Sequence, residues 1–231
     1  MHAPISDVDQ QDTQDATAQT DVDQVDADQT GADQPDPVDV FCTTPLHEAA
    51  AAGNDECVRQ LLVDGHKINP LDKQDRTPLL CAVEANHLTT ATILVNNGGK
   101  VNYPDSRSHA ILFAAVCFGS IEMVQLILNA GAQLDIVDER GRTAMHYAAT
   151  RPTNGMCMEL FYRGLAVDTP DTFGFTPFLF ALDQGATYAL DWLIDHGANP
   201  KARTYKGVSA AYLVNKCEDE WTTAKVARWM K

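Results

Sequence analysis

The sequence lacks the motifs around which most enzymes build a catalytic centre. It contains no G-x-S-x-G nucleophile elbow, no glycine-rich phosphate loop, no H-E-x-x-H zinc pattern and no dinucleotide-binding fingerprint. The usual sequence grounds for a hydrolase, a kinase, a metalloprotease or a NAD-dependent enzyme are therefore missing. We expect a protein that is not an enzyme and that needs no metal and no organic cofactor.

Cysteine pairs at metal-binding spacing are also absent. No C-x-x-C pair occurs, so the sequence indicates neither a zinc site nor a disulfide framework. Free cysteines are commonly part of a protein core, and we expect reduced, mostly buried thiols in a reducing compartment. The cysteines are Cys42, Cys57, Cys81, Cys117, Cys157 and Cys217.

No secretory leader is recognisable, because the N-terminus has no basic segment and no apolar run. The most apolar window, residues 110–128, is long enough on paper for a membrane span. However, Gly119 and Ser120 interrupt it, and Glu122 and Gln125 lie in its second half. We expect two short amphipathic helices in the core of a soluble protein, located in the cytoplasm or the nucleus and not in a membrane.

Basic residues are missing from the first 40 positions, which hold eleven aspartates and no lysine, arginine or glutamate. The rest of the chain has 21 acidic and 17 basic residues, a formal charge of −4, although the whole chain carries −15. Residues 1–38 have no aromatic side chain and few large apolar ones, so burial cannot offset their conformational entropy. We expect a disordered acidic tail, which is either a solvated spacer or an interaction segment.

A calcium loop does not fit this tail, although D-x-D pairs recur in it. Counted from Asp21, the fifth position of an EF-hand loop is Val25, and no loop glycine or terminal glutamate follows.

The chain does contain a repeat of 33 residues. Within the first repeat, Thr44 and Pro45 form a helix start, in which the threonine hydroxyl can accept a free backbone N–H and proline loses no hydrogen bond. A second helix ends at Gly65, a residue that adopts the left-handed turn at a helix C-terminus. The threonine position recurs as Thr77, Ala110, Thr143, Thr176 and Ser209, and the glycine as Gly98, Gly131, Gly164 and Gly197.

Each repeat therefore predicts a helix–turn–helix whose apolar faces are buried by the neighbouring repeats, since isolated helices of about ten residues are marginal in water. The segments "TPLHEAA" (44–50), "TPLLCAV" (77–83), "TAMHYAA" (143–149) and "TPFLFAL" (176–182) resemble the ankyrin-repeat signature T-P-L-H-x-A-A. The resemblance covers residues 39–231. It implies an all-α solenoid of stacked helix-turn-helix units with β-turn fingers at about right angles to the helices, preceded by the disordered tail of residues 1–38. The implied units are 39–71, 72–104, 105–137, 138–170, 171–203 and a C-terminal cap, 204–231.

Two units depart from the family pattern. In the third, "SHAILFAA" replaces the turn glycine, the capping threonine and the proline, which costs about 1 kcal/mol for the cap alone and predicts the least stable unit. In the sixth, no closing glycine follows the helix. We expect Trp221 and Trp229 to lie over the last core layer, as a terminal cap requires.

His47 and His146 occupy the histidine position of the signature. We expect each ring to hydrogen-bond backbone between adjacent units rather than to act in catalysis, because the two residues lie three units apart and geometry precedes pKa in naming a base.

In ankyrin-like stacks, partners contact the fingertips and the outward positions of the first helix of each unit, which together line a concave face. The resemblance places eight of the 17 basic residues there, with several aromatic ones, and arginine and aromatic residues dominate interface energetics. The candidate partner-binding residues are Lys73, Arg76, Arg107, His109, Phe118, Arg140, Arg142, Tyr147, Arg151, Phe173, Phe175, Tyr205 and Lys206.

We therefore expect a monomeric protein-interaction module that acts as an adaptor, an inhibitor or an effector. Its partner is another protein, with an acidic surface or one that accepts aromatic side chains. The alternative is an acidic-tail binder of basic proteins, or a nucleic-acid mimic, with the repeats as scaffold. Direct nucleic-acid binding is disfavoured because a net charge of −15 repels phosphate.

Overall fold

The computed structural model describes residues 44–102, 111–217 and 220–229, with no side-chain detail for residues 215–221. The chain divides between residues 34 and 35, and every described residue belongs to the second unit. The acidic tail and the finger of the third repeat, with Arg107 and His109, lie outside the described residues.

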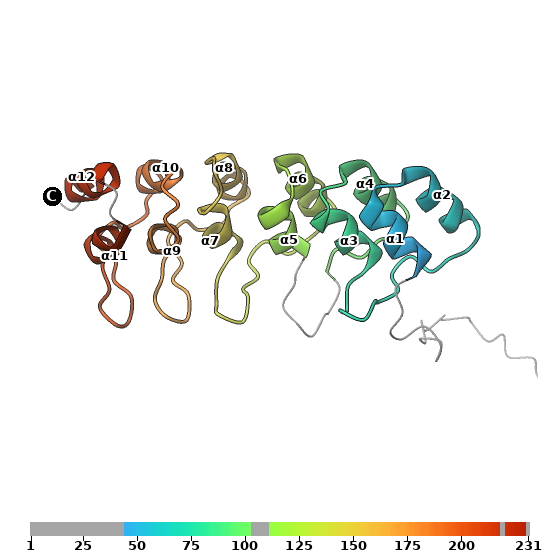
Figure 1. Cartoon of the computed structure of the whole chain (residues 1–231), viewed down its shortest axis with the longest axis horizontal. Coiled ribbons are helices and arrows are strands. Elements are labelled where there is room, and N and C mark those ends of the chain that lie inside the picture. Colours follow the sequence, from blue (N-terminus) through green and yellow to red (C-terminus); the bar gives the residue numbers. More distant parts are fainter. Residues whose placement is uncertain (1–43, 103–110, 218–219, 230–231) are drawn as a thin grey trace, which may run out of the picture. The chain divides into compact units, whose positions relative to one another are not determined.

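The described residues form α-helices that alternate with turns (Figure 1). The first helices of the repeats are α1 (Pro45–Ala52), α3 (Pro78–Glu84), α5 (Ile111–Phe118), α7 (Ala144–Ala148), α9 (Pro177–Asp183) and α11 (Ala210–Cys217). The second helices are α2 (Asp55–Val63), α4 (Leu88–Asn96), α6 (Ile121–Asn129), α8 (Gly155–Tyr162), α10 (Leu190–Asp195) and α12 (Glu220–Trp229).

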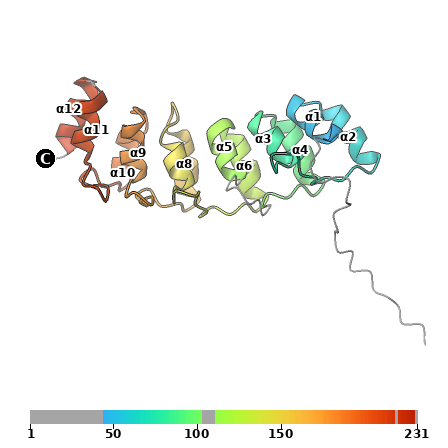
Figure 2. The ribbon, with the colours of Figure 1, turned by 60° about the horizontal axis from the view of Figure 1, so that its bottom comes forward.

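These helices pack in two layers that follow the order of the chain (Figures 1 and 2). Each first helix contacts its own second helix and the first helix of the next repeat, from α1 through α11, and α2, α4, α6 and α8 contact one another in sequence. The buried apolar side chains of all the repeats form one continuous cluster. The predicted all-α solenoid of stacked ankyrin-type hairpins is therefore confirmed.

The threonine-proline starts cap the first helices. The hydroxyls of Thr77 and Thr176 accept hydrogen bonds from the N–H groups of Leu80 (3.2 Å) and Leu179 (3.3 Å). Each satisfies one of the helix N–H groups that have no partner within the helix. The sequence signal and the local structure thus agree at both positions.

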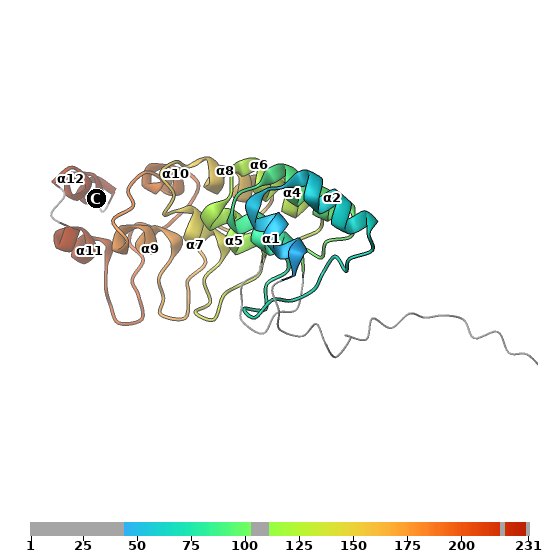
Figure 3. The ribbon, with the colours of Figure 1, turned by 45° about the vertical axis from the view of Figure 1, so that its right-hand side comes forward.

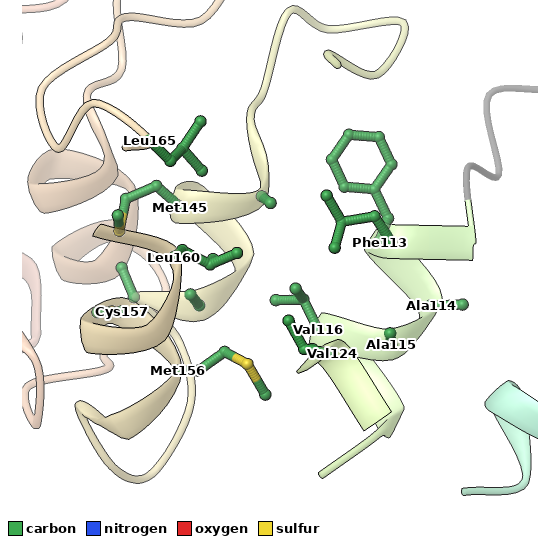
Figure 4. Packing of buried hydrophobic residues seen from close by; sticks show 14 of the residues in the cluster. Phe113, Ala114, Ala115, Val116, Val124, Met145, Met156, Cys157, Leu160 and Leu165 are labelled. Atoms are coloured by element: carbon green, nitrogen blue, oxygen red, sulfur yellow. The ribbon is translucent and has the colours of Figure 1, made fainter. Parts of the chain in front are cut away.

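The apolar window of residues 110–128 is divided between α5 and α6, which are separated at Gly119 and Ser120. Figure 4 shows Val116 and Val124 of this pair beside Met156 and Leu160 of the next. All four side chains are almost completely buried. The prediction of two short core helices is confirmed, and none of the described helices is long and apolar enough to cross a membrane.

Histidine rings join adjacent repeats, as predicted. Nε2 of His47 lies 2.8 Å from the carbonyl oxygen of Arg76, and Nε2 of His146 lies 2.9 Å from that of Phe175. In each ring Nδ1 accepts a hydrogen bond from the backbone N–H of the capping threonine. The distance is 3.3 Å for Thr44 and His47, and 3.1 Å for Thr143 and His146. The geometry therefore assigns the neutral tautomer with its proton on Nε2, which donates across the repeat boundary.

The C-terminal helix α12 covers the end of the core. The rings of Trp229 and Phe178 meet edge to face with centroids 5.8 Å apart, and Trp229 packs against the buried cluster. This confirms the expected role of Trp229, whereas the side chain of Trp221 lies outside the described part. Among the described cysteines, Cys81 and Cys157 are buried, Cys57 and Cys117 are half-buried, and all four are free thiols.

Candidate partner-binding face

The finger turns and the first helices α3, α5, α7, α9 and α11 make up what we call the inner face. Figure 3 shows the turns before α7, α9 and α11 side by side on one side of the helices. Thirteen residues of this face are candidates for partner binding, and the structure places the eleven that it describes in two groups. Those with solvent-exposed side chains are Lys73, Phe118, Arg140, Phe173, Tyr205 and Lys206, and those engaged within the fold are Arg76, Arg142, Tyr147, Arg151 and Phe175.

An aspartate anchors each described finger from the second to the fifth repeat. Asp138 Oδ1 accepts the backbone N–H groups of Arg140 and Arg142, both at 2.8 Å. Asp72 holds the finger of the second repeat in the same way, and Asp171 that of the fifth. These carboxylates replace the missing backbone partners of a tight turn, so they fix the shape of the inner face.

Arg142 is held by the same aspartate. Its Nε lies 2.9 Å from Asp138 Oδ2, and its guanidinium lies 5.0 Å from the ring centroid of Tyr147 and 5.2 Å from that of Phe180. The Tyr147 hydroxyl donates to Asp138 Oδ2 at 2.6 Å. Arg142 and Tyr147 thus both bind Asp138, and these contacts hold their side chains in place on the face.

The ionisation of this group follows from its contacts. Burial raises the pKa of Asp138, but hydrogen bonds from the Tyr147 hydroxyl and from the backbone of Arg142 and Arg140 outweigh it, and the pKa lies below its ordinary value. Burial, and then the bond to Asp138, raise the pKa of Tyr147. The carboxylate is therefore ionised and the phenol neutral at neutral pH.

Arg76 and Arg151 are also engaged within the fold. Arg76 pairs with Asp72 at 2.8 Å and with Glu84 at 3.2 Å. The guanidinium of Arg151 donates to the backbone carbonyls of Cys117 and Gly119, where it satisfies the C-terminal end of α5. Both arginines thus hold the elements of the inner face in place.

A hollow of about 300 Å³ lies on the inner face between the third and fourth repeats. Its apolar lining comes from α5 and its polar lining from the fourth finger, α7 and the end of α3. The lining residues are Glu84, Phe113, Ala114, Cys117, Phe118, Asp138, Glu139, Arg140, Arg142 and Tyr147. Four of the candidate residues therefore meet at one site: Phe118, Arg140, Arg142 and Tyr147.

The fingers of the fourth, fifth and sixth repeats are linked through their backbones. Thr172 donates its N–H and its hydroxyl to the carbonyl oxygen of Arg140, each at 2.8 Å, and the N–H of Tyr205 donates to that of Phe173 at 3.0 Å. Gly174 permits this contact, because a Cβ there would lie 2.7 Å from the nitrogen of Tyr205. We call these three linked turns the finger ladder.

The exposed side chains of the finger ladder are aromatic and basic. Phe173 and Tyr205 are 53% and 74% exposed. The side chains of Arg140 and Lys206 are exposed and have no ion-pair partner among the described residues. Phe175 instead packs against the core and supplies the carbonyl that binds His146.

The anchoring aspartates and Phe113 are the functional positions that the residue pattern on its own did not indicate. A signal was present for the aspartates, since Asp72, Asp138 and Asp171 follow the 33-residue period. Phe113 is almost buried, at 7% exposure, and nothing in the sequence separates it from the other core positions of α5.

The described residues contain no group of three or more histidine, cysteine, aspartate or glutamate side chains able to hold a metal ion. The inner face presents a hollow beside a row of exposed aromatic and basic fingertip side chains.

Comparisons with known proteins agree with the fold. The family model for ankyrin repeats in three copies matches residues 22–105 and 111–204. No curated protein matches the sequence. Among solved structures, one chain in the structure of a complex is similar, with a TM-score of 0.73 and 21% identity over 81% of this chain and 98% of that chain. The complex is that of the predatory endopeptidase Bd0816 from Bdellovibrio bacteriovorus with the immunity protein Bd3460. The 33-residue period, the stacked hairpins and the match over most of the sequence show that this chain belongs to the ankyrin-repeat family.

Proposed function

We propose that this chain is a non-enzymatic interaction module that binds a partner protein through the finger ladder and the adjoining hollow. The observation that carries the proposal is the exposure of Phe173, Tyr205, Arg140 and Lys206 on turns that are rigidly linked to one another. Exposed aromatic and basic side chains on a preformed surface are the residue types that supply most interface energy.

The likeness to the endopeptidase–immunity protein complex supports the fold alone at 21% identity. The function therefore rests on the chemistry of the inner face, together with the use of ankyrin repeats as interaction scaffolds. Whether the protein serves as an adaptor, an inhibitor or an effector depends on the partner. We propose residues 39–231 as the binding domain and residues 1–38 as a separate acidic segment.

Affinity capture with three forms of the protein tests this function. The Arg140→Glu/Phe173→Ser variant changes two exposed fingertips and leaves the Asp138–Arg142 pair in place. It should lose a partner that the unaltered chain retains. Arg59→Glu makes the same charge change on the exposed side of α2 and should retain that partner. If both variants retain it equally, the inner face is not the binding surface.

The ten aspartates of residues 1–38 favour a second candidate, in which this segment captures a basic protein and the repeats serve as scaffold. Deletion of residues 1–38 distinguishes the two. The finger-ladder proposal expects the deletion variant to keep its partner. The second candidate expects the partner to be lost, and expects its capture by the intact chain to disappear at high salt.

A further inference from the structure

The hollow beside α5 has an apolar floor and a polar wall on which two of the carboxylates already have partners. Phe118 is 60% exposed on this floor, next to Phe113 and Ala114. On the wall, Asp138 is bonded to Tyr147 and Arg142, and Glu84 is paired with Arg76. A polar ligand group would therefore find these two carboxylates already engaged, whereas an apolar group would cover Phe118 from water.

The size of the hollow restricts the occupant further. A volume of about 300 Å³ is at the lower end of the range for small-molecule sites, and it is enough for one large side chain. The hollow also adjoins the fourth finger, because Glu139 and Arg140 of that finger line it. A chain whose side chain enters the hollow would continue past these fingertips.

Two exposed basic side chains lie along that course, with one exposed carboxylate, that of Glu139, beside the first of them. Arg140 lines the hollow, and Lys206 occupies the corresponding fingertip position of the sixth repeat, with Phe173 between them in the fifth. The side chains of Arg140 and Lys206 are exposed and have no ion-pair partner within the described part of the chain. Acidic side chains of a partner would complement them without first breaking an existing pair.

We infer that the inner face recognises an extended peptide segment in which one aromatic side chain fills the hollow and acidic residues run along the finger ladder. This inference rests on the proposed function and specifies the partner's chemistry. The aromatic side chain packs against Phe118 and Phe113, and the acidic residues pair with Arg140 and Lys206. Aromatic rings are suited to such a site, because they bury a large area at a low cost in side-chain entropy.

Labelled synthetic peptides test the inference with the intact protein. The first peptide has nine residues, one tryptophan followed by glutamates at alternate positions, and the two matched peptides replace the tryptophan by alanine or the glutamates by lysine. At low salt, fluorescence anisotropy should show the first peptide binding at least tenfold more tightly than either matched peptide. Equal binding of all three, or no binding of the first at millimolar concentration, would overturn the inference.

Substitutions in the protein test where the tryptophan peptide binds. Phe118→Ala should weaken binding of the tryptophan peptide at least fivefold, whereas Tyr162→Ala, at another exposed aromatic residue, on α8, should not change it. Arg140→Glu should weaken it at least tenfold, and Arg59→Glu should not. If a control variant weakens binding as much as its inner-face counterpart, the inference is wrong.

Cys117 gives a readout that does not depend on substitution, because it lines the hollow and is a half-buried free thiol. Its alkylation by iodoacetamide, followed by peptide mapping, should slow when the tryptophan peptide is bound, whereas alkylation of half-buried Cys57 should not. Equal protection of both thiols, or of neither, would contradict occupation of the hollow.

A single-stranded thymidine oligonucleotide of twelve residues serves as a competing probe. If it binds more tightly than the tryptophan peptide, the aromatic and basic fingertips recognise nucleic acid, and the inference fails. The capture experiment with Arg140→Glu/Phe173→Ser remains independent. If the captured partner is lost in this variant but the three peptides bind equally, this inference is wrong and the proposed function stands.

Discussion

Nε2 of His146 lies 2.9 Å from the carbonyl oxygen of Phe175, one repeat further along the chain. The same ring accepts the backbone N–H of Thr143 at 3.1 Å through Nδ1. One fully buried side chain thus satisfies a helix cap in the fourth repeat and a turn carbonyl in the fifth. This contact and the backbone hydrogen bonds of the finger ladder hold the fourth and fifth fingers together.

Replacement of His146 by alanine should therefore destabilise the fold by about 1–3 kcal/mol, because it leaves a buried N–H and a buried carbonyl without partners. The free energy of unfolding in urea measures this. His66→Ala is the control, since that side chain is exposed and its loss should change the stability by less than about 0.5 kcal/mol. Equal effects of the two substitutions would show that the bridge contributes nothing.

The stability should also fall in mildly acidic solution. Burial lowers the pKa of His47 and of His146 below the ordinary value of 6.5, although nearby Asp72 and Asp171 act in the opposite direction. As the pH falls below 6.5, the unfolded chain takes up protons that the folded chain does not, so stability decreases until the folded-state pKa values are reached.

Urea unfolding at a series of pH values from 7.5 to about 5 measures this dependence. The loss of stability below pH 6.5 should be smaller in a His47→Gln/His146→Gln variant, in which neither bridging ring is left to titrate. His66→Gln should retain the dependence of the unaltered protein. A pH profile that is unchanged in the double variant would assign the dependence to other groups.

The contact between the fifth and sixth fingers requires a glycine at position 174. Its φ is +84°, and a Cβ would lie 2.7 Å from the backbone nitrogen of Tyr205, whereas Gly207 has a similar φ of +79° with no atom within 4 Å of such a Cβ. Alanine at Gly207 should cost about 1 kcal/mol for the left-handed conformation alone. Alanine at Gly174 should cost more, because the fifth and sixth fingers must separate. Equal losses of unfolding free energy would show that the fingers are not held together.

Asp168 is a position at which the chain can be made more stable. The first two repeats carry Asn69 and Asn102 there, and each side-chain NH₂ donates to a turn carbonyl of the next repeat, Gly98 at 3.1 Å and Gly131 at 2.7 Å. Asp168 accepts the backbone N–H of Asn199, but its buried Oδ1 has no partner in the described structure. Burial raises the pKa of this carboxyl above its ordinary value.

Asp168→Asn should therefore stabilise the protein by about 1 kcal/mol at neutral pH, because the amide supplies the missing donor without a charge. Thermal unfolding measures the gain as a rise in Tm. Asp135→Asn is the matched control, since Asp135 occupies the same position in the repeat and is exposed. A lower Tm for the Asp168 variant would mean that the carboxylate has a partner that the asparagine loses.

The architecture could be predicted from the sequence because the same local signals recur at a fixed interval. Thr77, Pro78 and Gly98 each specify a local backbone conformation, and the fifth repeat specifies the same ones at the same spacing with Thr176, Pro177 and Gly197. Consistent local signals of this kind leave few alternative ways to pack the helices. The inter-repeat role of His146 could be anticipated for the same reason.

The chemistry of the inner face was less predictable. The positions of Arg140 and Arg142 in the repeat indicated that both lie on one finger. They did not indicate that the side chain of Arg140 is exposed, whereas that of Arg142 is paired with Asp138. That difference depends on contacts with Tyr147 and Phe180, which come from two other elements. Partner choice depends on such contacts, and a repeat pattern does not encode them.

Hydrogen–deuterium exchange of the protein with its captured partner is the most direct measurement of the central claim. The account predicts slower exchange in the fingers of the fourth to sixth repeats, residues 138–142, 171–175 and 204–208, and in α5 beside the hollow. Exchange in α2, α4 and α6 should remain unchanged. Protection of those second helices, with unchanged exchange in the three fingers, would contradict binding through the inner face.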